Sequence, residues 1–194
     1  MSQPIPRQLA ALALAFGLAA HAAPSPALKA GVFEPPRQAP ELALRGSNGA
    51  ELKLSTYRGK LVLLSFGFTS CAAVCPVTLA TLTQARKLLG SLADSVQVVF
   101  VTVDPERDDP QRMKTFLAAF DPTFVGATGK PEALEAVRRS YGVSARKIPM
   151  ADGYLFDHSS SIFLIDAEGR LRAMMPYGHD AKDFVHDIKL LLAK

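Results

Sequence analysis

The chain has 194 residues, of which 48% are hydrophobic and 21% charged, enough for one domain with a substantial core and ordinary for a globular protein. Its formal net charge of +4 is only mildly basic. The sequence contains no run of Lys and Arg interleaved with aromatic residues, so the composition argues against nucleic acid as a partner.

The first 22 residues have the pattern of an export signal. Arg7 precedes an uninterrupted apolar run over residues 9–20, and Ala20 and Ala22 form an Ala-x-Ala cleavage pattern. The run is shorter than the roughly 20 residues that a helix needs to cross a bilayer. We therefore predict a signal peptide over residues 1–22, with an uncleaved membrane anchor as the alternative.

Residues 23–40 are rich in Pro and Ala, and they predict a tether that leads into a domain over residues 41–194. Export places this domain in an oxidising compartment, so the predicted location is the bacterial periplasm, either free or anchored to the inner membrane. Because the chain has only two cysteines, their state in that compartment decides which chemistry is open to it.

The first predicted elements of the domain are a hairpin, a buried strand and a helix. Leu residues alternate on both sides of "GSNG" within residues 41–60, which predicts a β-hairpin. The continuous apolar run over residues 61–68 is typical of a strand buried on both faces. A helix is predicted from Pro76, since proline suits the first helical position.

The later elements complete an α/β order. A second buried strand is predicted over residues 96–104, and Asp109 before Pro110 predicts the N-cap of the next helix. There follow a short helix over residues 131–143, a hairpin over 160–177 and an amphipathic helix over 181–193. Buried strands that alternate with helices predict a thioredoxin-like α/β sandwich, with a central mixed β-sheet flanked by helices and an N-terminal β-hairpin.

Cys71 and Cys75 follow the first buried strand directly, within "FTSCAAVCP". Open α/β sheets place their sites at the carboxyl ends of the strands. The start of the following helix favours a thiolate, so we expect a lowered pKa for Cys75. A four-residue offset brings the two sulfurs near each other if the stretch is helical, and two adjacent thiolates chelate a soft ion such as Cu(I).

Besides metal binding, three other kinds of chemistry are possible for this pair of thiols. A structural disulfide is disfavoured because so short a loop constrains little entropy in the unfolded chain. Thiol–disulfide exchange suits thiols at a helix start, but "HSSSIF" lacks the proline that thioredoxin-like reductases place opposite their cysteines. A peroxiredoxin-like peroxidase would have Thr where Ala72 stands.

His158 is the residue that favours metal binding over these alternatives. It precedes a predicted strand, and in a thioredoxin-like fold that loop faces the cysteine loop. Beside two thiols it completes a site of two sulfurs and one nitrogen. The neighbouring Asp157 is a candidate for orienting the imidazole ring.

Three stretches together resemble the Sco/SenC family of copper-binding proteins, which help to assemble the CuA centre of cytochrome c oxidase. They are "GKLVLLSFGFTSCAAVCPVTL", "VTVDPERDDP" and "DHSSSIFLIDAEG", and the resemblance covers residues 31–194. It implies that Cys71, Cys75 and His158 are copper ligands, and Asp104 matches an acidic residue near the family's site. The family usually has Pro-Asp where this chain has Ala72 and Ala73, so we expect a looser loop with one charge fewer beside the thiols.

The resemblance implies a periplasmic copper metallochaperone, not an enzyme, that carries Cu(I) or Cu(II). Its expected partners are a cytochrome c oxidase subunit or another copper chaperone, and a periplasmic thiol reductant that opens a Cys71–Cys75 disulfide. The alternative is a thiol–disulfide reductase that keeps client cysteines reduced for metal loading.

Overall fold

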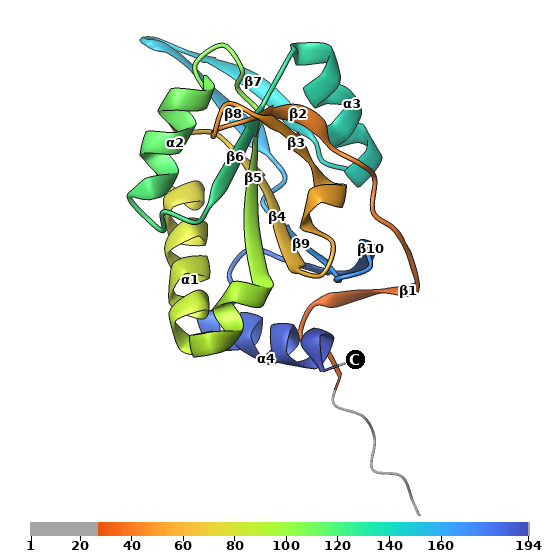
Figure 1. Cartoon of the computed structure of the whole chain (residues 1–194). Coiled ribbons are helices and arrows are strands. Elements are labelled where there is room, and N and C mark those ends of the chain that lie inside the picture. The colour runs from red at the N-terminus through yellow and green to blue at the C-terminus, as the bar shows by residue number, and fades with distance from the viewer. Residues whose placement is uncertain (1–26, 194) are drawn as a thin grey trace, which may run out of the picture.

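The structure is a computed structural model that describes residues 27–193 (Figure 1). The predicted signal peptide lies outside these residues. Within them, no helix is both long enough and apolar enough to cross a membrane.

Eight strands form a central mixed sheet in the order β1-β10-β9-β4-β5-β6-β2-β3. Only the β4–β5 and β5–β6 pairs are parallel, and the remaining neighbours are antiparallel. The strands are β1 Gly31–Gln38, β2 Ala43–Gly46, β3 Glu51–Lys53, β4 Leu61–Gly67, β5 Val96–Thr102, β6 Val125–Thr128, β9 Ile162–Ile165 and β10 Arg170–Met175. The predicted mixed sheet and the predicted hairpin, seen as β2–β3, are confirmed.

A second sheet of two strands, β7 (Ala145–Met150) and β8 (Gly153–His158), pairs only with itself. It extends from the domain as a hairpin (Figure 1). No backbone ladder joins it to the central sheet, so side chains must hold it in place. This hairpin was not among the predicted elements, and neither was β6.

Four helices cover the central sheet: α1 Val74–Leu89, α2 Pro110–Ala118, α3 Pro131–Tyr141 and α4 Ala181–Leu192. Neighbouring residues of β4 point to opposite faces. The backbone of Gly67 lies against Cys75 of α1, whereas the Phe66 ring packs on Tyr141 of α3 with centroids 5.8 Å apart. The helices α1 and α3 therefore lie on opposite faces, and α4 packs against α1 (Figure 1).

The prediction of a tether over residues 23–40 is wrong for residues 31–38, which form β1. This strand pairs antiparallel with β10 at the sheet edge, and the register shifts between Val32 and Arg37, around the two prolines. Proline cannot donate to a ladder, but an edge strand with a register shift does not need those N–H groups. The ordered domain therefore includes this segment.

Asp109 caps α2 as predicted, because its side chain accepts a hydrogen bond of 2.8 Å from the backbone N–H of Arg112. Replacing the cap with Asp109→Ala is expected to lower the free energy of unfolding by about 1 kcal/mol. Asp109→Asn keeps an accepting oxygen and should cost little. Urea denaturation of the two variants checks this, and equal losses would show that the cap is not the cause.

Candidate metal centre

The two cysteines lie where β4 gives way to α1, at the carboxyl end of the central parallel strands. Cys71 is half-buried in the connecting loop, and Cys75 is only 4% exposed in the first turn of α1. The helix begins at Val74, two residues before the predicted start at Pro76. Cys75 is therefore inside the helix, and Cys71 is the cysteine that faces its N-terminus.

This placement changes which of the two thiols the start of the helix activates. Burial opposes ionisation of Cys71, but hydrogen bonds from the N–H groups of Cys75, Ala73 and Val74 outweigh it, so the pKa of Cys71 is lowered. Burial raises the pKa of Cys75 far above its usual range, although a backbone hydrogen bond from Phe68 opposes the shift. The prediction of a lowered pKa for Cys75 is wrong, and the activated thiol is Cys71.

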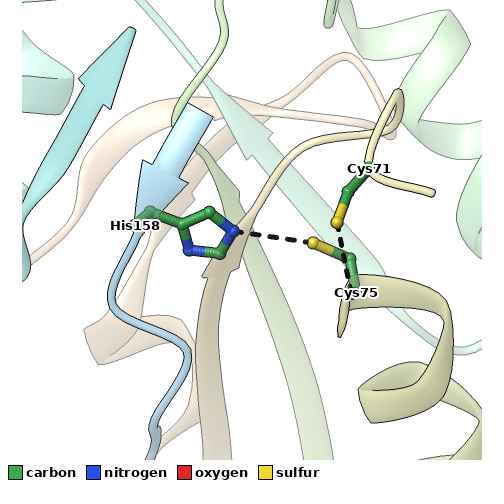
Figure 2. Close-up of side chains that lie close together, drawn as sticks. All are labelled: Cys71, Cys75 and His158. Atoms are coloured by element: carbon green, nitrogen blue, oxygen red, sulfur yellow. Dashed lines mark hydrogen bonds between the residues drawn. The ribbon is translucent and has the colours of Figure 1, made fainter. Parts of the chain in front are cut away.

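His158 ends β8 and faces the cysteines from the hairpin (Figure 2). Its Nδ1 lies 2.8 Å from the carbonyl oxygen of Ser159, which can only accept, so Nδ1 carries the proton. The free lone pair is then on Nε2, which lies 3.8 Å from the Sγ of Cys75. The His158 ring also meets the Phe68 ring edge-on, with centroids 5.8 Å apart.

The three side chains converge on one point. The Sγ atoms of Cys71 and Cys75 and a ring nitrogen of His158 all lie within 4.8 Å of one another. Donor atoms about 2.0–2.3 Å from a shared ion in a trigonal arrangement stand roughly 3.5–4 Å apart, so a small inward shift would satisfy a metal. No other group of three His, Cys, Asp or Glu side chains in residues 27–193 has this geometry.

A pocket of about 290 Å³ opens next to these donors. The side chains around it are mostly apolar: Phe68, Ala72, Ala73, Val74, Leu155 and Phe156. Soft sulfur ligands in apolar surroundings suit a soft, monovalent ion better than Mg²⁺ or Ca²⁺, which prefer oxygen.

The two acidic residues that the sequence singles out have different surroundings. Asp157 is 70% exposed and pairs with Arg146 at 3.4 Å, so the bond that orients the His158 ring comes from Ser159 instead. Asp104 is only 1% exposed and follows β5. It accepts a hydrogen bond from Tyr154 of the hairpin that bears His158.

Sequence reasoning missed the roles of Ser159 and Phe68. The residue type of Ser159 does not indicate a contact of its backbone carbonyl, and the apolar run over residues 61–68 predicts for Phe68 only a place in the buried strand. Neither residue could have been found without the position of the hairpin.

Comparison with known proteins finds a family that matches most of the chain. The SCO1/SenC family model matches residues 34–193. An SCO2-like protein of Rickettsia felis is 35% identical over 133 residues, 67% of this chain and 65% of that protein. The chain thus spans just under two thirds of that relative's length.

The chain is also similar to solved structures of Sco proteins. The structure of Bradyrhizobium japonicum ScoI with copper bound is 35% identical, with a TM-score of 0.74, and the match covers 80% of this chain and 99% of that one. The solution structure of apo Sco1 from Thermus thermophilus is 36% identical, with a TM-score of 0.77, and covers 86% and 98%. The thioredoxin-like fold is confirmed.

Proposed function

The chain belongs to the SCO1/SenC family, and on that premise we propose that it is an exported copper metallochaperone. It binds copper through Cys71, Cys75 and His158 and passes the ion to the CuA site of cytochrome c oxidase or to another copper chaperone. The observation that supports this most directly is the convergence of two sulfurs and one imidazole nitrogen within 4.8 Å.

Each residue has a distinct part in holding the ion. Cys71 supplies the more readily formed thiolate, because helix N–H groups favour its charge. Cys75 supplies a second sulfur that is shielded from water. His158 offers the Nε2 lone pair, and Ser159 fixes its tautomer.

The N-terminal export pattern supports a periplasmic location, with the chain either released or anchored to the inner membrane. In that compartment a thiol reductant must keep both cysteines reduced before copper can bind. No covalent bond of a substrate is made or broken, so the role is that of a carrier and not of an enzyme.

A second candidate function is thiol–disulfide exchange with client cysteines. The specific observation in its favour is the lowered pKa of the accessible Cys71 beside the buried Cys75, the arrangement of an attacking and a resolving thiol. This reaction needs both cysteines but has no use for His158.

His158→Ala separates the two functions. We expect Cu(I) affinity to fall by at least about 10- to 100-fold, the loss typical when only an outer hydrogen-bond partner of a ligand is removed, because here one of three ligands is lost. The rate of disulfide exchange with a small disulfide should stay within about twofold. Titration of the reduced protein against a chromophoric Cu(I) chelator gives the affinity, and Cys71→Ser/Cys75→Ser is the reference for loss of both activities. Copper affinity indifferent to His158→Ala would favour the reductase.

A further inference from the structure

We infer that the connection between β5 and α2, residues 103–109, sets the distance between the cysteine loop and the histidine hairpin, with Asp104 and Asp108 as positioning residues. We call this segment the bridging loop. The inference rests on the proposed function in taking Cys71, Cys75 and His158 as copper ligands, and it adds the residues that hold these ligands at the correct separation.

Asp108 holds the cysteine loop. Its side chain has no exposed surface, and it accepts hydrogen bonds from the backbone N–H of Thr69 at 3.0 Å and from the Thr69 hydroxyl at 2.6 Å. Thr69 lies two residues before Cys71. A third bond, of 2.6 Å, comes from the Thr102 hydroxyl at the end of β5. The buried carboxylate thus ties the cysteine loop to the central sheet.

Arg112 strengthens the same attachment from the surface. Its Nε donates to the Thr69 hydroxyl at 2.7 Å, and a terminal nitrogen donates to the Ser70 hydroxyl at 3.1 Å. Arg112 also lies 3.9 Å from Asp108. Two consecutive residues immediately before Cys71 are therefore held from α2 and the bridging loop.

Asp104 holds the other half of the site. Its Oδ1 accepts a hydrogen bond of 3.0 Å from the Tyr154 hydroxyl, whose single proton it shares with a carboxylate oxygen of Glu106, 3.1 Å away in the same loop, and its Oδ2 pairs with Arg107. Arg107 in turn donates to the backbone carbonyl of Tyr154 at 3.2 Å and lies 3.9 Å from the centre of the Tyr154 ring. Both ends of Tyr154, hydroxyl and backbone, are thereby attached to the bridging loop.

Tyr154, Phe156 and His158 share one face of β8, because alternate side chains of a strand point the same way. Tyr154 meets Asp104, Phe156 packs edge-on against Phe68 at 5.9 Å, and His158 faces Cys75. The hairpin has no backbone ladder to the central sheet. The contacts of Tyr154 and Phe156 therefore fix the position of His158.

The Thr102 hydroxyl joins the two attachments. It donates to Asp108 and accepts a hydrogen bond of 2.9 Å from the backbone N–H of Asp104. The attachments of the cysteine loop and of the hairpin thus meet at the Thr102 hydroxyl, at the carboxyl end of β5. A change on the Asp104 side should displace His158, whereas a change on the Asp108 side should displace Cys71.

Tyr154→Phe tests the Asp104 side, because it removes one hydroxyl and keeps the ring. We expect Cu(I) affinity of the reduced full chain to fall about three- to tenfold, with no further fall when the change is made in a His158→Ala background. Tyr141→Phe is the matched control, since it removes a hydroxyl, on a helix across the sheet from Cys75, that donates to the carbonyl of Pro40, and it should leave copper affinity unchanged.

Thr69→Val tests the Asp108 side. Its expected loss of Cu(I) affinity is of similar size, but it persists in the His158→Ala background, because it acts through the cysteine loop. Two results would overturn the positioning role of Asp104. One is an equal loss of Cu(I) affinity from Tyr154→Phe in the wild-type and His158→Ala backgrounds. The other is no loss of affinity from Tyr154→Phe when the wild-type protein binds copper. Equal affinity of Thr69→Val and wild type would overturn that of Asp108.

A metal-free measurement separates this inference from the proposed function. In the NMR spectrum of the reduced, metal-free protein, Tyr154→Phe should shift the imidazole resonances of His158, and Tyr141→Phe should not. If wild type takes up no copper, the proposed function fails, and the His158 shift still decides whether the bridging loop positions that ring. Unmoved His158 resonances would contradict the inference.

Discussion

Protein that carries a Cys71–Cys75 disulfide is expected to bind no measurable copper, and reduction is expected to restore one equivalent per chain. A metal needs both sulfurs as thiolates, whereas a disulfide joins them at about 2.05 Å and removes their charge. Both cysteines are free in the structure, with donor atoms within 4.8 Å, so the loop needs little movement to reach either state. Copper uptake measured on fully oxidised and fully reduced samples checks the prediction.

The reductant must donate two electrons to the disulfide, and it must not remain in the sample as a competing copper ligand. A small dithiol reduces the disulfide to two thiols, becomes a disulfide itself, and is removed before copper is added. Bound Cu(I) should then protect both cysteines from alkylation. Equal uptake by oxidised and reduced protein would show that the cysteines are not the primary ligands.

Gly67→Ala is expected to cost about 3 kcal/mol of unfolding free energy and to weaken copper binding together with it. A Cβ at this position would lie 2.6 Å from the Phe100 ring and 2.8 Å from the Sγ of Cys75. Both neighbours are buried, so neither can move away freely. Denaturant unfolding of the metal-free protein measures the first effect, and Cu(I) titration measures the second.

Gly31→Ala in β1 is the matched control, because its added Cβ would meet only the Met174 carbonyl oxygen, at an ordinary 3.6 Å. We expect it to change stability by less than about 1 kcal/mol and copper affinity not at all. A stability loss for Gly67→Ala no greater than that of Gly31→Ala would contradict the claim that Gly67 makes room for the Cys75 sulfur.

The strands β4 and β5 at the centre of the sheet were predictable because they are buried on both faces. Every residue of β4 is buried, and the sequence shows this as an apolar run that only Ser65 interrupts. By contrast, β1 contains two prolines and lies at the sheet edge, where its side chains are mostly exposed. Its backbone hydrogen bonds go to β10, more than 130 residues later in the chain. The local composition of β1 does not predict so distant a partner.

The three metal-binding candidates were predictable from residue type and spacing, but their supports were not. The β7–β8 hairpin has alternating half-buried and exposed residues and owes its position to Asp104 and Phe68. The helix starts at Val74 instead of Pro76, so its N–H groups lower the pKa of Cys71, and burial raises the pKa of Cys75, for which a lowered value was expected. Such reversals follow from distances of a few ångströms, which a sequence pattern does not resolve.

In the proposed copper transfer, the unequal burial of the two sulfurs gives the exchange of ligands a direction. Cys71 lies in a loop beside exposed Ala72 and Ala73, whereas Cys75 is 4% exposed beneath it. A ligand from another protein is then expected to approach the bound ion from the side of Cys71 and to replace that bond first. We expect Cys75 to release the ion last, so that copper stays attached to one protein until the other has formed its own bonds and is not released into solution between them.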